Sequence, residues 1–144
     1  MPEDGEITVD GVDIEGVREV LRSRDLEFAL LFGSHARGEA HKSSDVDITL
    51  RFPETMDDTE RFRERNRIDA ELQAHASGFV DVSDIETLPT PVAYAALRDG
   101  IRLVGDREAV ESVRAEVEAE YESTAEQRKR EREELIDRLA RGDI

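Results

Sequence analysis

The 144-residue sequence contains no cysteine, and only two of its 20 basic residues, Lys42 and Lys129, are lysines. The lack of cysteine excludes disulfide bonds and metal sites built from thiolates. The sequence also has no long apolar run of the kind that spans a membrane, and its N-terminus lacks the pattern of a signal peptide. We therefore expect one domain in the cytoplasm, without membrane binding.

The charge is strongly one-sided, because 36 acidic residues against 20 basic ones give a formal net charge of −16. Proteins that bind nucleic acid on their own usually carry the opposite sign, so direct nucleic-acid binding is not expected. Abundant Asp and Glu with scarce Lys are similar to the composition of proteins from salt-loving archaea, where concentrated salt screens self-repulsion. The acidity thus indicates a halophilic habitat rather than an activity. Disorder is the alternative, but apolar periodicity persists along the chain.

Helical and strand patterns alternate along the sequence. Short apolar or alternating runs predict strands, and i, i+3, i+4 spacing predicts helices, the first of them capped by Asp13. The expected strands are 26–32, 46–52, 79–85 and 101–105, and the expected helices are 13–24, 57–76, 92–100 and one long C-terminal helix over 108–141. This order predicts an α/β or α+β fold. We divide it into a core of residues 1–106 and a C-terminal helical extension of the same domain, residues 107–144.

Two aspartates, Asp45 and Asp47, stand at the start of an alternating strand. Residues two apart in a strand point to the same face, so both carboxylates would project together. Mg²⁺ prefers one or two carboxylates together with substrate phosphates, which makes the pair a candidate metal site. In a chain this acidic, however, the same spacing also arises by chance.

A second candidate feature precedes this pair, where the apolar run over 26–32 ends in Gly33 and Ser34. If a helical turn opens at Ser34, free backbone N–H groups and the helix dipole would favour an anion there. Glycine lets a phosphate approach the backbone, the serine hydroxyl adds a donor, and Arg37 matches phosphate geometry. A plain strand-to-helix turn explains Gly33 equally well when it is taken alone.

The two features together would hold a triphosphate and its metal between neighbouring strands. A second metal would need a third carboxylate, and Asp81, an acid flanked by apolar residues in the next strand, is the candidate. A buried, unpaired carboxylate in that place is costly, so a metal or another partner is expected beside it. Asp84, closer to the end of the strand, is the weaker rival.

These residues resemble a known family. The segments "GSHARG", residues 33–38, and "SDVDI", residues 44–48, are similar to the Gly-Ser-x-Ala-Arg-Gly and Ser-Asp-x-Asp motifs of the minimal nucleotidyltransferases, which belong to the DNA polymerase beta-like superfamily. The third strand, with its acid and its proline-led helix, also looks like theirs. The resemblance covers roughly residues 26–105 and implies a nucleotidyltransferase fold with a small mixed sheet flanked by helices.

The resemblance implies metal-dependent transfer of a nucleoside monophosphate from ATP. Asp45, Asp47 and Asp81 would then bind Mg²⁺, with Mn²⁺ as an alternative, and Asp81 would also help to deprotonate the attacking hydroxyl. The residues expected to bind the phosphates or to orient the aspartates are Gly33, Ser34, Arg37 and Ser44. His35 fills a variable position of the motif, so it is expected to lie at the surface without a role.

Small members of this family commonly act as antitoxins of HEPN-type RNase toxins, and relatives transfer AMP to a tyrosine hydroxyl of the toxin. The resemblance therefore implies a protein adenylyltransferase in a homo- or hetero-oligomer, and the C-terminal helix could dock the partner or pack on its own sheet. Two alternatives stay open: transfer to a small hydroxylated molecule such as an aminoglycoside, and a non-catalytic antitoxin that masks the toxin. Template-directed polymerisation fits neither the charge nor the size.

Overall fold

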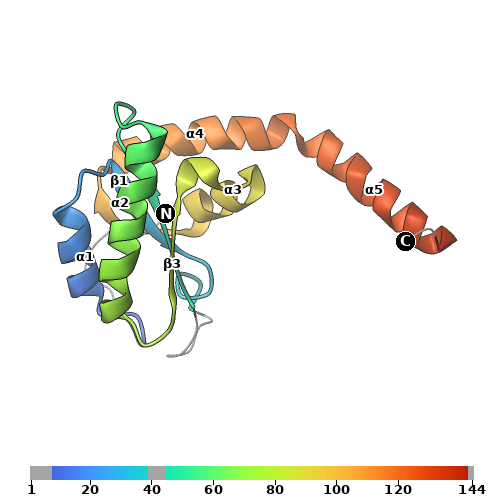
Figure 1. The fold of residues 1–144 in the computed structure, drawn as a ribbon. Helices are drawn as coiled ribbons and strands as arrows, with labels where there is room; N and C mark the ends of the chain where they lie inside the picture. Colours follow the sequence, from blue (N-terminus) through green and yellow to red (C-terminus); the bar gives the residue numbers. More distant parts are fainter. Residues whose placement is uncertain (1–7, 39–44, 143–144) are drawn as a thin grey trace.

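The computed structural model describes residues 8–38 and 45–142 (Figure 1). Its strands form one sheet in the order β3-β2-β1-β4. Strand β1 is antiparallel to both β2 and β4, whereas β2 and β3 run parallel, so the sheet is mixed as expected. The strands are β1 (Phe28–Phe32), β2 (Val46–Arg51), β3 (Val80–Asp84) and β4 (Ile101–Gly105).

The helices cover both faces of the sheet, which confirms the predicted α/β class (Figure 1). Within the described ranges, no helix combines the length and the apolar character needed to cross a bilayer. The helices are α1 (Ile14–Arg22), α2 (Asp58–Leu72), α3 (Thr90–Asp99), α4 (Arg107–Ser123) and α5 (Ala125–Arg141), with two 3-10 turns, η1 (Gln73–His75) and η2 (Ile85–Thr87).

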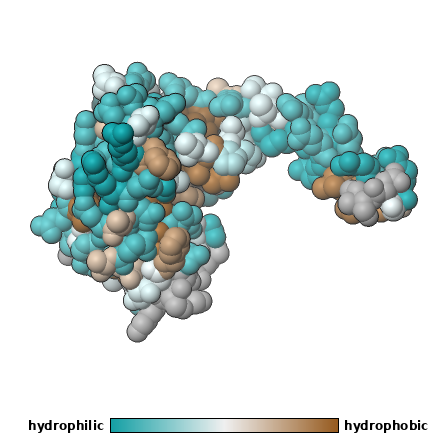
Figure 2. Space-filling view, in the orientation of Figure 1, coloured by the Kyte–Doolittle hydropathy of each residue, from teal (hydrophilic) through white to brown (hydrophobic). Residues whose placement is uncertain are grey.

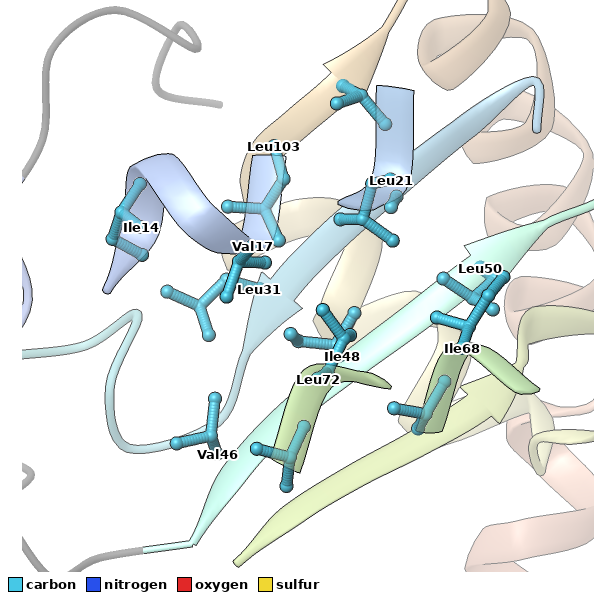
Figure 3. Close-up of a cluster of buried hydrophobic side chains, with 14 of the residues drawn as sticks. Ile14, Val17, Leu21, Leu31, Val46, Ile48, Leu50, Ile68, Leu72 and Leu103 are labelled. Carbon is cyan, nitrogen blue, oxygen red and sulfur yellow. The ribbon is translucent and has the colours of Figure 1, made fainter. Parts of the chain in front are cut away.

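Helices α1 and α2 pack on one face of the sheet (Figure 3). The alternation of β2 aims Val46, Ile48 and Leu50 at this layer, where they are almost completely buried, as the sequence pattern predicts. Asp13 caps α1 by accepting a hydrogen bond from the N–H of Gly16 at 3.1 Å, which confirms the predicted start of that helix.

Helices α3 and α4 pack on the opposite face, against Phe28 and Leu30 of β1. Val110 and Val113 of α4 belong to this second cluster, so the first half of the C-terminal helical segment packs on its own sheet. Residues of β2 that alternate with the core positions, Asp47 among them, face this side. The sheet therefore places the candidate site on the α3 side.

The single helix expected over 108–141 is wrong, because the chain bends at Thr124 between α4 and α5. The Thr124 hydroxyl lies 3.0 Å from the Glu120 carbonyl, and the Arg128 side chain donates to the Tyr121 carbonyl at 2.8 Å. Hydroxyl groups that bond back to the preceding turn commonly bend a helix. Beyond the bend, α5 extends away from the body and buries none of its residues (Figure 1).

Candidate active site

The parallel pairing of β2 with β3 brings two of the predicted acids side by side. Asp47 is the register partner of Asp81, and on its other side Asp47 is the partner of Phe32, the last residue of β1. Asp45 comes directly before β2 and is exposed. The three carboxylates predicted from the sequence are thus gathered at one end of the sheet.

The electrostatics of Asp47 show how closely these groups lie. Its side chain is partly buried, and this desolvation, followed by the negative charges of Asp81 and Asp45, raises the pKa of Asp47 above its ordinary value. The positive charges of His35 and Arg37 act in the opposite direction on the same pKa. The acids therefore repel one another at this end of the sheet, and basic groups of the preceding turn offset part of that repulsion.

Gly33 directly follows β1 and lies against this cluster. Its backbone has a φ of +75°, a conformation that side chains rarely adopt. A Cβ atom on Gly33 would lie 2.4 Å from Oδ2 of Asp47, closer than atoms can approach. Glycine is therefore required here for two reasons, backbone conformation and the space that the Asp47 carboxylate occupies.

The segment after Gly33 is a turn over residues 33–38, and the described part of it contains no helix. Two helix-like hydrogen bonds close it, from the N–H of Arg37 to the Gly33 carbonyl at 3.2 Å and from the N–H of Gly38 to the His35 carbonyl at 3.4 Å. These bonds form the one helical turn that the sequence predicts, and the described residues do not extend it into a longer helix. Ser34 is half-buried and Arg37 is exposed in the turn, whereas Ser44 lies outside the described residues.

His35 differs from its expected position, because only 7% of it is exposed. The prediction of a surface histidine is therefore wrong. The turn folds His35 inward, and its charge acts on Asp47. The sequence contained no signal for this, because burial of one residue in a six-residue turn depends on what lies beneath the turn.

Asp81 and Asp84 occupy opposite faces of β3. Asp81 is exposed beside Asp47, so the argument that a buried carboxylate needs a partner does not apply to it. Asp84 is only 5% exposed, and its Oδ2 forms an ion pair with Nε of Arg61 at 3.0 Å. Its Oδ1 accepts a hydrogen bond from the N–H of Glu86 at 3.0 Å. Asp84 therefore stabilises the junction of β3 with α2, away from the other acids.

A hollow of about 330 Å³ adjoins the Gly33 turn. Gly33 and Arg37 line one side of it, and Val92, Ala95 and Asp99 of α3 line the other. Hollows of similar or larger size surround Arg51, Asp84 and Glu86, at the other end of the sheet from the acids, and have no part in this site.

The donor set fits a hard divalent cation, because all three acids offer carboxylate oxygens. Among the residues described, no three potential ligands already form a metal-binding group. That finding is compatible with a cation that is held by one or two of the carboxylates and completed by phosphate oxygens of a substrate.

The sequence and the fold are similar to those of known proteins. The family model described as "Polymerase beta, Nucleotidyltransferase" matches residues 15–109. The protein adenylyltransferase MntA of Shewanella oneidensis is 26% identical over 83 residues, and the match covers 58% of this chain and 57% of that protein. This chain therefore matches little more than half the length of that curated relative.

Solved structures of toxin–antitoxin complexes contain a similar fold. A chain from a toxin–antitoxin complex with AMP-PNP matches with a TM-score of 0.70 and 21% identity, over 87% of this chain and 99% of that one. A chain from the complex of a tri-AMPylated Shewanella oneidensis HEPN toxin with its MNT antitoxin matches with a TM-score of 0.64 and 19% identity, over 85% and 95% of the two chains. Because the family model spans more than half of the sequence, this chain belongs to the polymerase beta-like nucleotidyltransferase family.

Proposed function

We propose that this chain is the antitoxin of a toxin–antitoxin pair, and that it transfers AMP from ATP to a tyrosine hydroxyl of a HEPN-type RNase toxin. The observation that carries the proposal is the meeting of Asp47, Asp81 and the Gly33 turn at one end of the sheet. A relative that is named a protein adenylyltransferase, and a similar fold in a complex with a tri-AMPylated HEPN toxin, support the choice of acceptor.

In the proposed reaction, the tyrosine oxygen forms a bond to the α-phosphorus of ATP. The bond between that phosphorus and the oxygen bridging to the β-phosphate breaks, so AMP stays on the tyrosine and pyrophosphate leaves. The hydroxyl proton passes to the carboxylate of Asp81, which is exposed to solvent and to an incoming protein. AMP on the tyrosine would neutralise the toxin.

The Gly33 turn is the proposed phosphate site. Gly33 lets the β- and γ-phosphates approach the backbone, and the Ser34 hydroxyl and the Arg37 guanidinium donate hydrogen bonds to them. Ser44 keeps the role implied by the resemblance, orientation of the aspartates. Asp45, Asp47 and Asp81 would hold Mg²⁺ or Mn²⁺, which neutralises phosphate charge when it is bound.

The proposal is tested by incubating the purified chain with ATP, Mg²⁺ and a candidate HEPN-type toxin, sought in the neighbouring open reading frame, followed by intact-mass spectrometry of that toxin. We expect mass increments of AMP with the wild-type chain and their loss with Asp47→Ala. Adducts that persist with Asp47→Ala would contradict the catalytic assignment.

The two alternatives give different results in the same experiment. A tight complex without any adduct would identify an antitoxin that masks its toxin. Consumption of ATP only in the presence of a small hydroxylated molecule would identify a transferase of the antibiotic-modifying kind.

A further inference from the structure

Two phenylalanines are the large aromatic residues that the described chain exposes most, Phe62 on α2 at 62% and Phe79 before β3 at 60%. Neither ring belongs to the apolar clusters on the two faces of the sheet. Phe62 has a local partner, because the guanidinium carbon of Arg65 lies 5.7 Å from the centre of its ring. Phe79 differs from Phe62 in position, because Phe79 lies at the end of the sheet where the three carboxylates gather.

The strand ladder fixes where Phe79 lies. The N–H of Val46 donates to the carbonyl of Phe79 at 2.8 Å, so the pairing of β2 with β3 extends back to this residue. Phe79 is therefore beside Asp45 and two residues before Asp81. Val80 and Val82 point into the core, and the alternation of the strand places Phe79 on the same face as Asp81.

Strand β3 is an edge of the sheet, but its backbone is not free to pair with another strand. The side chain of Gln73 bonds both the N–H and the carbonyl of Val80, at 3.1 and 2.7 Å. Arg65 donates to the carbonyl of Val82 at 2.8 Å. A protein that approaches Asp81 from this edge must therefore use side-chain contacts, and Phe79 is the apolar side chain next to the acids.

The proposed nucleotide site and Phe79 lie on opposite sides of the acids. In the sheet order, the turn with Gly33 and Arg37 follows β1, and β2 separates β1 from β3. Two strand spacings, roughly 10 Å, thus separate Phe79 from the proposed phosphate site. Asp81, which takes the proton of the attacking hydroxyl in the proposed reaction, is the register partner of Asp47 and lies two residues from Phe79 on the same strand. Phe79 is therefore on the acceptor side of the reaction.

We propose that the exposed ring of Phe79 is a contact surface for the acceptor, and that it positions an aromatic acceptor side chain beside Asp81. This inference rests on the proposed function. A tyrosine ring is the partner that suits Phe79, because aromatic pairs attract each other beyond the burial of their area. Phe79 thus selects a protein acceptor with an aromatic ring over a sugar hydroxyl.

The test is steady-state AMP transfer to the candidate HEPN-type toxin, measured for wild type, Phe79→Ala, Phe79→Trp and the matched control Phe62→Ala. We expect Phe79→Ala to raise the KM for the acceptor on the order of tenfold, because anchoring aromatic residues dominate such contacts. The KM for ATP should not change. Phe79→Trp should retain acceptor affinity, and Phe62→Ala should behave as wild type in both titrations.

Other outcomes separate this inference from the function on which it rests. Wild-type protein that transfers no AMP would overturn the proposed function itself. Transfer that Phe79→Ala leaves undiminished, or an equal loss in Phe62→Ala, would overturn only the role of Phe79. A rise in the KM for ATP instead of the acceptor would place the ring against the nucleoside and would also overturn it. Unfolding temperatures of all variants exclude a folding defect as the cause.

Discussion

The α-carbon of Gly33 faces the carboxylate of Asp47 so closely that an added Cβ atom would lie 2.4 Å from Oδ2. Gly38, six residues after the end of β1 in the same turn, has an almost equal φ of +72°, but among the described residues a Cβ atom there would meet nothing within 4 Å. Alanine substitutions at the two glycines therefore measure the cost of backbone conformation separately from the cost of displacing Asp47.

Gly33→Ala and Gly38→Ala should both destabilise the fold by about 1 kcal/mol, because alanine in the left-handed conformation is strained. Only Gly33→Ala should also abolish AMP transfer, since its methyl group must push the Asp47 carboxylate away. Thermal unfolding measures the first effect, and mass spectrometry of the acceptor protein measures the second. Equal activity of the two variants would show that the position of Asp47 is not critical.

Asp47→Asn should raise the unfolding temperature at pH 7 in buffer with a chelator. Folding raises the pKa of Asp47, through burial and then the charges of Asp81 and Asp45. The ionised carboxylate therefore lowers the free energy of unfolding. The cost is present above the raised pKa, declines as the pH falls through it, and is gone below the unfolded value of about 3.9. The gain from Asp47→Asn should therefore shrink in acid.

The control for this variant is Asp25→Asn, at an exposed acid in the loop before β1, which should change the unfolding temperature little at any pH. Mg²⁺ should stabilise the wild-type chain more than Asp47→Asn, because the neutral amide binds a cation less well. A loss of stability in Asp47→Asn at pH 7 would contradict the repulsion argument.

Arg61→Met should destabilise the fold by about 3 kcal/mol, because it leaves the carboxylate of Asp84 buried without its ion-pair partner. Asp84→Asn should lower the free energy of unfolding by less, about 1 kcal/mol, since Arg61 keeps Asp58 and Glu86 as partners. Denaturant unfolding measures both values. Transfer of AMP per folded molecule should stay at the wild-type level in Asp84→Asn, and its loss there would place Asp84 in the reaction.

Helix α5 should tolerate polar substitution. Leu135, Ile136 and Leu139 are exposed on it, and apolar surface shows near the end of the projecting arm in Figure 2. Leu139→Asp should change the free energy of unfolding by no more than about 0.5 kcal/mol. The same change at Val110, which is fully buried in the cluster under α3 and α4, should unfold the protein.

The same α5 variant tests the expectation that the C-terminal segment docks the partner. Calorimetric titration with the HEPN-type protein should show weaker binding by Leu139→Asp if α5 contacts it. Unchanged binding would restrict the docking surface to the body of the chain.

Local patterns predicted most elements of this fold, but not the break between α4 and α5 at Thr124. The alternation in β2 predicted its core face, and Asp13 predicted the start of α1. Val110 and Val113 pack on the sheet, which is one of the two alternatives that the sequence left open. Gly33 after one strand and Asp47 at the start of the next predicted a site between neighbouring strands, and the antiparallel pairing of β1 with β2 brings the two together. These features depend on residues near one another in the chain.

Only the tertiary structure decided the features that depend on contacts between distant segments. The parallel register of β2 with β3 put Asp81, rather than Asp84, beside Asp47, and α2 supplied the arginine that pairs with Asp84. Burial of His35 depends on what lies under its turn, and the significance of Phe79 depends on the strand next to it. The sequence by itself determined which chemical groups are present and in which elements, whereas packing determined which of them face one another.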